Sequence, residues 1–77
     1  MEDEKMNNED LNRRRALAFY KEKLIVHITK TNGTFYNGRI LKVDDEFFTI
    51  NDREEGAKIV FFFELKHPIT EFEEVGG

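Results

Sequence analysis

The 77-residue sequence predicts a mainly β protein, in which an N-terminal α-helix precedes a five-stranded, strongly bent antiparallel small barrel. Two observations carry this prediction: a helical pattern gives way to segments rich in β-branched residues, and short polar or glycine-containing turns separate those segments. The length allows one domain. We expect it to span residues 7–73, with the barrel at about 23–72, between a disordered acidic tail at 1–6 and a frayed C-terminus at 74–77.

The helix is expected at about residues 8–21. Asn7 is a typical N-cap, and Glu9 and Asp10 place negative charge at the positive end of the helix dipole. Leu17, Tyr20 and Leu24 form an apolar row with helical spacing, and Leu11, Arg14 and Ala18 form the adjoining row.

Five strands follow, at residues 24–29, 34–43, 47–51, 58–65 and 69–72. The first two are joined by Asn32-Gly33, a strong hairpin signal because both residue types tolerate positive φ. Gly38, inside the second strand, suggests a bulge or sharp bend that lets a small sheet curl. Residues 44–46 and 52–57 are polar or charged turns.

Charge is distributed unevenly along the chain, whose net charge is −4. Residues 1–10 carry a net −4, residues 11–42 a net +7 and residues 43–77 a net −7. Such a chain can present a basic face and an acidic face, although ordinary solvated surface explains the pattern equally well. The sequence has no cysteine, no apolar run near the ~20 residues of a membrane helix, and an acidic, polar N-terminus. We therefore expect a cytoplasmic protein without a membrane partner.

Two motifs resemble those of the Sm-like (LSm/Hfq-like) family. In 26-VHITKTNGTFYNGRILKVDDEFF-48, five positions match the first family motif in register: Gly33, Gly38, Ile40, Val43 and Asp44. The segment 65-LKHPI-69 resembles the Lys-His form of the second, shorter motif. The resemblance covers roughly residues 9–72 and implies a small barrel that assembles into a closed homo-oligomeric ring of five to seven subunits.

Ring assembly would explain the uninterrupted apolar run 59-IVFFF-63, because the family pairs the fourth strand of one subunit with the fifth strand of the next. One face of the run would fill the barrel and the other would pack on the neighbour. The alternative is that the chain's own helix covers the strand. The expected interface residues are Ile59, Val60, Phe61, Phe62, Phe63, Ile69 and Phe72.

The resemblance also implies binding of single-stranded RNA. Lys66 and His67 occupy the second-loop contact positions, and Arg13, Arg14 and Arg15 would form a basic patch on the helix. The alternatives are a solvated turn before Pro68 for the first pair, and for the arginines a solvated helix face with pairing to Glu9, Asp10 or a neighbour's acids. Asp44 matches the first-motif loop, but Glu46 and Phe48 replace the family's stacking and base-reading residues, so uridine-specific recognition is doubtful. Phe47 or Phe48 offers a replacement stacking face, unless the pair belongs to the core and the interface.

Two function classes remain open. The first is an RNA-binding ring of low sequence specificity that acts in RNA metabolism or regulation, and the second is a ring-shaped scaffold that binds protein partners. An enzyme is not expected, because the chain has neither Ser nor Cys, and its two His residues lack metal-ligand spacing. We expect no cofactor and no metal.

Overall fold

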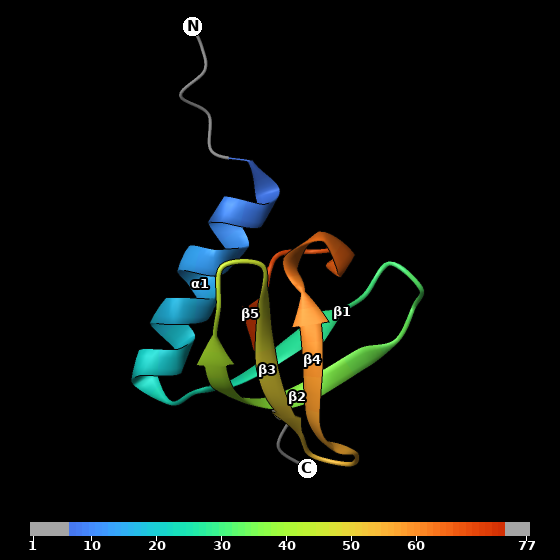
Figure 1. Ribbon diagram of the computed structural model, residues 1–77. Helices are drawn as coiled ribbons and strands as arrows, with labels where there is room; N and C mark the ends of the chain where they lie inside the picture. The colour runs from blue at the N-terminus through green and yellow to red at the C-terminus, as the bar shows by residue number, and fades with distance from the viewer. Residues whose placement is uncertain (1–6, 74–77) are drawn as a thin grey trace, which may run out of the picture.

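The computed structural model describes residues 7–73 and contains one α-helix, five strands and one short 3-10 helix (Figure 1). The elements are α1 (Asn8–Glu22), β1 (Ile25–Thr29), β2 (Phe35–Val43), β3 (Phe47–Asp52), β4 (Gly56–Phe61), η1 (Phe62–Glu64) and β5 (Thr70–Glu71). The strands form one antiparallel sheet of order β4-β3-β2-β1-β5, which confirms the predicted mainly β fold of a helix followed by a five-stranded antiparallel sheet. The predicted tail and frayed C-terminus lie outside the described residues.

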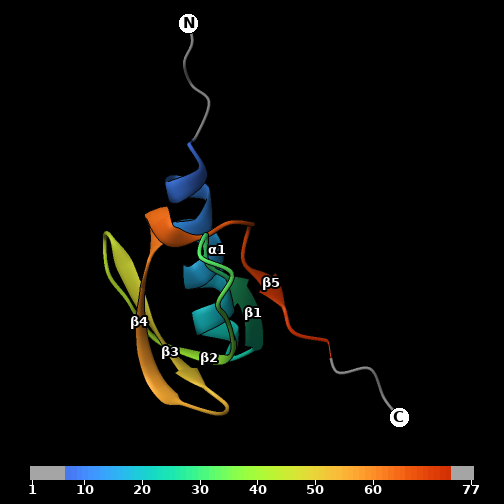
Figure 2. The ribbon, with the colours of Figure 1, turned by 90° about the vertical axis from the view of Figure 1, so that its right-hand side faces the viewer.

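The sheet is strongly bent, and its two edge strands end up far apart. Figure 2 shows β4 and β5 on opposite sides of the molecule. The core lies within the bend and consists of Ala16, Val26, Ile28, Ile40, Phe48, Ile50, Val60, Phe62 and Ile69. Strands β1 and β3 each contribute two alternate residues to it and β2 and β4 one each, as expected for a sheet with one buried face.

Helix α1 begins and ends as the sequence predicts, but it packs through a different face. The Oδ1 atom of Asn7 accepts a hydrogen bond from the Asp10 amide at 2.8 Å, which confirms the predicted N-cap. The buried helical residues are Asn12 and Ala16, whereas Leu17 and Tyr20 are 42% and 43% exposed. The small Ala16 side chain lets the helix approach the sheet closely, so the predicted Leu17–Tyr20 row is the outward face.

The β1–β2 hairpin is confirmed, with a different turn geometry from the one expected. Within the Asn32-Gly33 pair, positive φ occurs at Gly33 alone, at 90°. Lys30 and Thr34 close the loop through a backbone bond of 2.7 Å, and the Asn32 side chain accepts from the Thr34 amide at 2.9 Å. The loop is therefore a three-residue hairpin connection ending in a left-handed glycine.

Gly38 has a packing role rather than the bulge that the sequence suggests. A Cβ atom at this position would lie 1.9 Å from the backbone oxygen of Asn51 on β3, so only glycine fits. The register shift of β2 against β3 occurs between Ile40 and Lys42 instead. Close backbone approach and a nearby bulge together bend the sheet.

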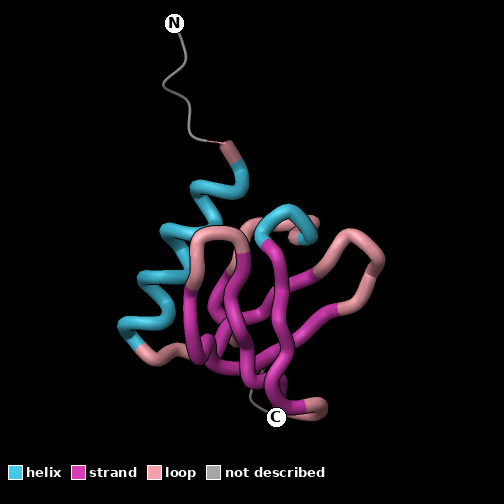
Figure 3. The backbone as a smooth tube through the Cα atoms, in the orientation of Figure 1, coloured by secondary structure: helices cyan, strands magenta, loops and turns pink. Residues whose placement is uncertain are grey.

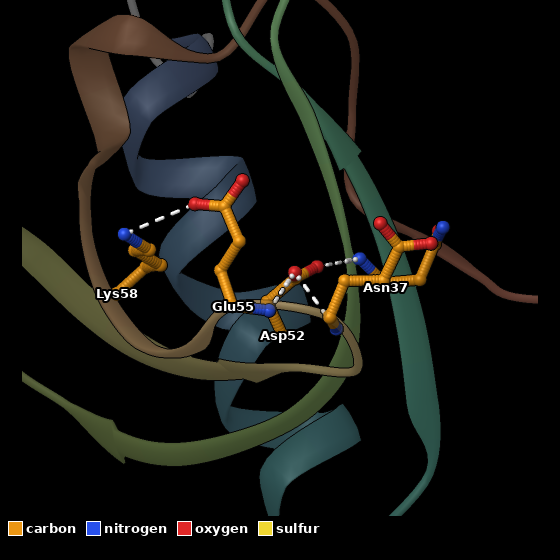
Figure 4. A network of polar contacts seen from close by, with 5 residues as sticks. Asn37, Asp52, Glu55 and Lys58 are labelled. Atoms are coloured by element: carbon orange, nitrogen blue, oxygen red, sulfur yellow. Dashed lines mark hydrogen bonds and ion pairs between the residues drawn. The ribbon is translucent and has the colours of Figure 1, made fainter.

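The β3–β4 turn is held by one carboxylate (Figure 4). Asp52 accepts hydrogen bonds from the backbone amides of Asn37, Glu54 and Glu55 at 3.0, 3.1 and 2.9 Å. Desolvation acts to raise the pKa of Asp52, but these amide bonds outweigh it and the pKa lies below its ordinary value. Lys58 is 3.1 Å from Glu55, and this hydrogen-bonded contact raises the pKa of Lys58.

The predicted fourth strand, residues 58–65, is too long. Strand β4 ends at Phe61, and Phe62–Glu64 form η1, the short helical segment between β4 and β5 in Figure 3. The Glu64 side chain accepts a hydrogen bond from the Phe61 amide at 3.1 Å, and the Phe62 amide donates to the Glu46 carbonyl at 2.9 Å. These local bonds turn the backbone out of the strand before the predicted end.

Candidate nucleic-acid interface

The loop that contains Lys66 and His67 is fixed against the first half of α1. Its anchor is Ile69, whose side chain is fully buried. The Ile69 amide donates to Oδ1 of Asn12 at 2.9 Å, and the Ile69 carbonyl accepts from Nε of Arg15 at 2.7 Å. Both backbone groups of one residue are thus held by the helix, which sets the position of the preceding loop.

Lys66 and His67 themselves face solvent, as the sequence predicts for contact residues. The Lys66 amide donates to the Thr29 carbonyl at 2.8 Å, so the backbone is anchored to the end of β1. Both side chains are exposed, and neither forms an ion pair within residues 7–73. The loop therefore combines a fixed backbone with available cationic and imidazole groups.

The three consecutive arginines have different surroundings and do not form one patch. Arg15 is partly buried, donates to Ile69 and lies with its guanidinium carbon 5.8 Å from the Phe19 ring centroid. Arg13 pairs with Asp10 at 3.2 Å and reaches the Asp45 carbonyl at 3.4 Å. Arg14 is exposed and makes no hydrogen bond or ion pair with another described residue. Arg14 is therefore the member of the triplet best placed to meet a phosphate.

The region of the β2–β3 loop offers fewer candidate RNA-contacting side chains than the sequence suggests. Phe48 is 0% exposed in the core, so the prediction that it stacks on a base is wrong. Phe47 is half-buried, with its ring centroid 5.5 Å from that of Phe61. Glu46 is exposed beside it, and its charge would repel phosphate.

Asp44 is the other residue of this loop that the sequence singles out. Its Oδ2 atom is buried and receives no hydrogen bond from the described residues, although the Lys42 ammonium lies 3.5 Å away. The Asp44 amide donates to the Phe47 carbonyl at 2.8 Å, which closes the loop. Asp44 thus closes the loop through its backbone amide, and its carboxylate lies beside the Lys42 ammonium.

The predicted interface residues fall into two groups. Val60, Phe62 and Ile69 are at most 3% exposed and belong to the chain's own core, because their side chains point into the bend of the sheet. Ile59 and Phe63 are 57% and 66% exposed. The outward-facing group is completed by two half-buried rings, Phe61, which lies 5.4 Å from Phe63, and Phe72, over which Arg53 lies at 5.3 Å.

Two residues that the sequence did not single out position the site. Asn12 is the buried polar residue that holds Ile69, and its spacing with Ala16 and Phe19 at i, i+4 and i+7 was the signal for the packed face. Lys30 lies 3.7 Å from Glu64 and 5.9 Å from the Tyr36 ring, so it ties the end of β1 to η1. The helical spacing could have located the packed face, but not the partners Ile69 and Glu64, which come from distant positions.

Other kinds of site find little support in residues 7–73. That region holds no cluster of three His, Cys, Asp or Glu side chains that could bind a metal ion. His27 Nδ1 lies 2.6 Å from Asn37 Oδ1, which places the imidazole in a cross-strand pair on β1 and β2. Neither helix in this part of the chain has the length and apolar character needed to cross a membrane. A scan of protein-family models finds no match, and a search of curated proteins finds no similar sequence.

Proposed function

We propose that the protein is a ring-forming Sm-like protein that binds single-stranded RNA with low sequence specificity, and that it acts in RNA metabolism or regulation in the cytoplasm. The observation that carries this proposal is the anchoring of the Lys66–His67 loop to α1 through Asn12 and Arg15. The helix and the loop become one unit that presents Arg14, Lys66 and His67 to solvent.

The contacts would be mainly to phosphate. Lys66 and Arg14 supply positive charge for phosphate oxygens, and His67 can hydrogen-bond a phosphate or stack on a base. Phe48 is buried and Glu46 is acidic, so this loop offers no reader of a base edge. Binding of this kind depends strongly on salt and weakly on sequence.

Ring assembly would multiply these few cations. Strand β4 is a sheet edge, and unpaired edges favour pairing with another chain. The outward side chains Ile59, Phe61 and Phe63 lie on or next to this edge and would pack on a neighbouring subunit. Five to seven copies would place as many Lys66 side chains around one axis, and avidity would strengthen weak single contacts.

The proposal is tested by measuring mass and RNA binding together. Light scattering should give a mass of five to seven chains, and fluorescence anisotropy with oligo-U, oligo-A and mixed-sequence RNA should show binding at about 50 mM salt that weakens steeply with added salt. Lys66→Gln combined with Arg14→Gln should reduce affinity for all three RNAs alike. No binding at low salt, or a monomeric mass, would contradict the proposal.

A second candidate is a ring scaffold that binds a protein partner. It is favoured by the same loss of base-reading groups, since Phe48 is in the core and Glu46 faces solvent. A pull-down from cell extract separates the two candidates. Recovery of RNA supports the first, and recovery of one defined protein without RNA supports the second.

A further inference from the structure

The C-terminal end of α1 carries a second group of exposed cations. We define the helix-end patch as Lys21, Lys23 and Arg39. All three residues are exposed, and none pairs with a carboxylate of residues 7–73. Three other lysines, by contrast, are paired: Lys30 is 3.7 Å from Glu64, Lys42 3.5 Å from Asp44 and Lys58 3.1 Å from Glu55. The helix-end patch therefore keeps its charge available.

The backbone of Lys23 joins two members of the helix-end patch, Lys23 and Arg39. Its carbonyl oxygen accepts a hydrogen bond from Nε of Arg39 at 3.0 Å, although Arg39 belongs to β2. Arg39 also lies opposite Ile25 in the β1–β2 ladder, which fixes its position along the strand. The Arg39 guanidinium is thus held beside the end of α1 while remaining exposed.

Lys23 occupies a conformation that lysine rarely adopts. Its φ is 57° and its ψ is 36°, and among residues 7–73 it is the one non-glycine residue with positive φ. Glycine is the usual residue at this point after a helix, because a Cβ atom is sterically unfavourable there. Disfavoured conformations gather at functional sites, so this one points to a use for the Lys23 side chain.

Favourable interaction with the helix dipole explains only part of the arrangement. Cations in the last turn are stabilised by the negative end of the helix, which accounts for Lys21. The dipole does not require a lysine in the left-handed position at residue 23. It also does not require an arginine of β2 to lie beside the end of the helix. An anion that contacts Lys21, Lys23 and Arg39 together accounts for all three.

We propose that the helix-end patch binds the phosphate backbone of an RNA strand that also contacts the Lys66–His67 loop. This inference rests on the proposed RNA-binding function. Arg14 and Lys21 are seven residues apart, so they lie on the same side of α1, about 10 Å apart along its axis. Arg14 and Lys21 therefore form one cationic track along the exposed side of α1, towards the helix-end patch.

A nucleic acid fits this track better than an acidic protein does. Flexible Lys and Arg side chains without an enclosing pocket are typical of phosphate contacts. Tyr20 is 43% exposed and lies three residues before Lys23 in the last turn of α1, where its carbonyl accepts from the Lys23 amide at 3.2 Å. An exposed aromatic ring can stack on a base of the same strand.

The test compares two double variants that lose the same charge. Lys21→Gln/Lys23→Asn removes two cations of the helix-end patch, and Asn tolerates the left-handed conformation at position 23. Lys42→Gln/Lys58→Gln removes two cations that are already paired. Binding of a short fluorescein-labelled RNA of mixed sequence is measured by anisotropy over a range of salt concentrations, after thermal melts show that both variants fold.

We expect the helix-end variant to bind about tenfold more weakly at low salt, and the slope of log K against log salt to become shallower by about 1.4, since each single-strand phosphate contact contributes about 0.7. The matched control should keep the wild-type slope. Equal weakening of both variants would assign the effect to net charge and overturn the proposal.

Three further outcomes would also overturn it, and they can be told apart. If wild type binds RNA and Lys66→Gln weakens binding while the helix-end variant binds as wild type does, the helix-end patch is wrong and the proposed function stands. If wild type binds no RNA, both the proposed function and the proposal for the helix-end patch are wrong. A poly-glutamate peptide serves as the second probe, and loss of its binding with unchanged RNA binding would assign the patch to an acidic protein.

Discussion

Helix α1 and the β4–η1 segment both expose large apolar side chains, but in different surroundings. On α1, Leu17 and Tyr20 lie on a face that also carries Arg14 and Lys21. On β4–η1, Ile59 to Phe63 contains no charged residue, and β4 is an open edge of the sheet. Exposure of apolar side chains alone therefore does not identify an interface. Apolar residues dispersed among charged ones are common on a solvent-exposed surface. A continuous apolar run beside unpaired backbone groups is typical of a surface that binds another chain.

The largest effect is expected inside the β4–η1 segment. Phe62→Ala should lower the free energy of unfolding by about 3–5 kcal/mol, because the ring is 3% exposed and lies 5.4 Å from Phe48. Urea unfolding at constant protein concentration measures the change. If the free energy of unfolding fell by less than about 1 kcal/mol, this would contradict the conclusion that the Phe62 ring is packed in the core.

A smaller loss is expected where α1 holds the loop. Asn12→Leu leaves the buried Ile69 amide without its acceptor, which should cost about 1–3 kcal/mol. The variant should also weaken RNA binding, since the Lys66 loop loses its anchor. Asn51→Leu, at an exposed position on β3, is the matched control and should change neither quantity.

The outward faces provide the direct comparison of the two segments. Phe63→Ser should reduce the oligomeric mass while changing the stability of the protomer by no more than about 0.5 kcal/mol. Leu17→Ser should leave both the mass and the stability unchanged within the same limit. Light scattering over a dilution series measures the mass. Equal behaviour of the two variants would remove the distinction drawn between the helix and the edge strand.

The smallest effect concerns the β3–β4 turn and depends on pH. The folded pKa of Asp52 lies below its ordinary value, so the ionised carboxylate contributes stability above the unfolded pKa of about 3.9. That contribution should disappear as pH falls through the lower folded value. Wild type should therefore have a slightly higher urea midpoint than Asp52→Asn near neutral pH, and the difference should vanish in acid. A difference that persists there would indicate a role for Asp52 other than its charge.

Much of the fold could be predicted because it depends on local signals. The Asn7 cap, the Asn32-Gly33 hairpin and the strand segments are each encoded within a few residues. The end of β4 could not be predicted in this way. The apolar run 59–63 predicts a continuous strand. The backbone nevertheless leaves the strand at Phe62, because Glu46 and Glu64 accept hydrogen bonds from the amides of Phe62 and Phe61.

The candidate site was predicted less completely. Lys66 and His67 are exposed as expected, because a polar pair before proline belongs to a loop. The arginine triplet was not resolved into its separate roles, since only the packed helix shows that Arg15 faces Ile69 and that Arg14 does not. Phe47 and Phe48 likewise differ only through strand register, which turns Phe48 into the core.

The sequence by itself determined the class of fold, the order of helix and strands, the exposed cationic loop and the uneven distribution of charge. These follow from periodicity, capping and turn residues, which act over a few positions. Tertiary structure alone decided which face of α1 is buried, which phenylalanines are available to a partner and that Arg39 lies beside Lys23 at the end of α1. Those choices rest on contacts between residues such as Asn12 and Ile69, 57 positions apart, whose pairing exists only once the sheet has bent around its core.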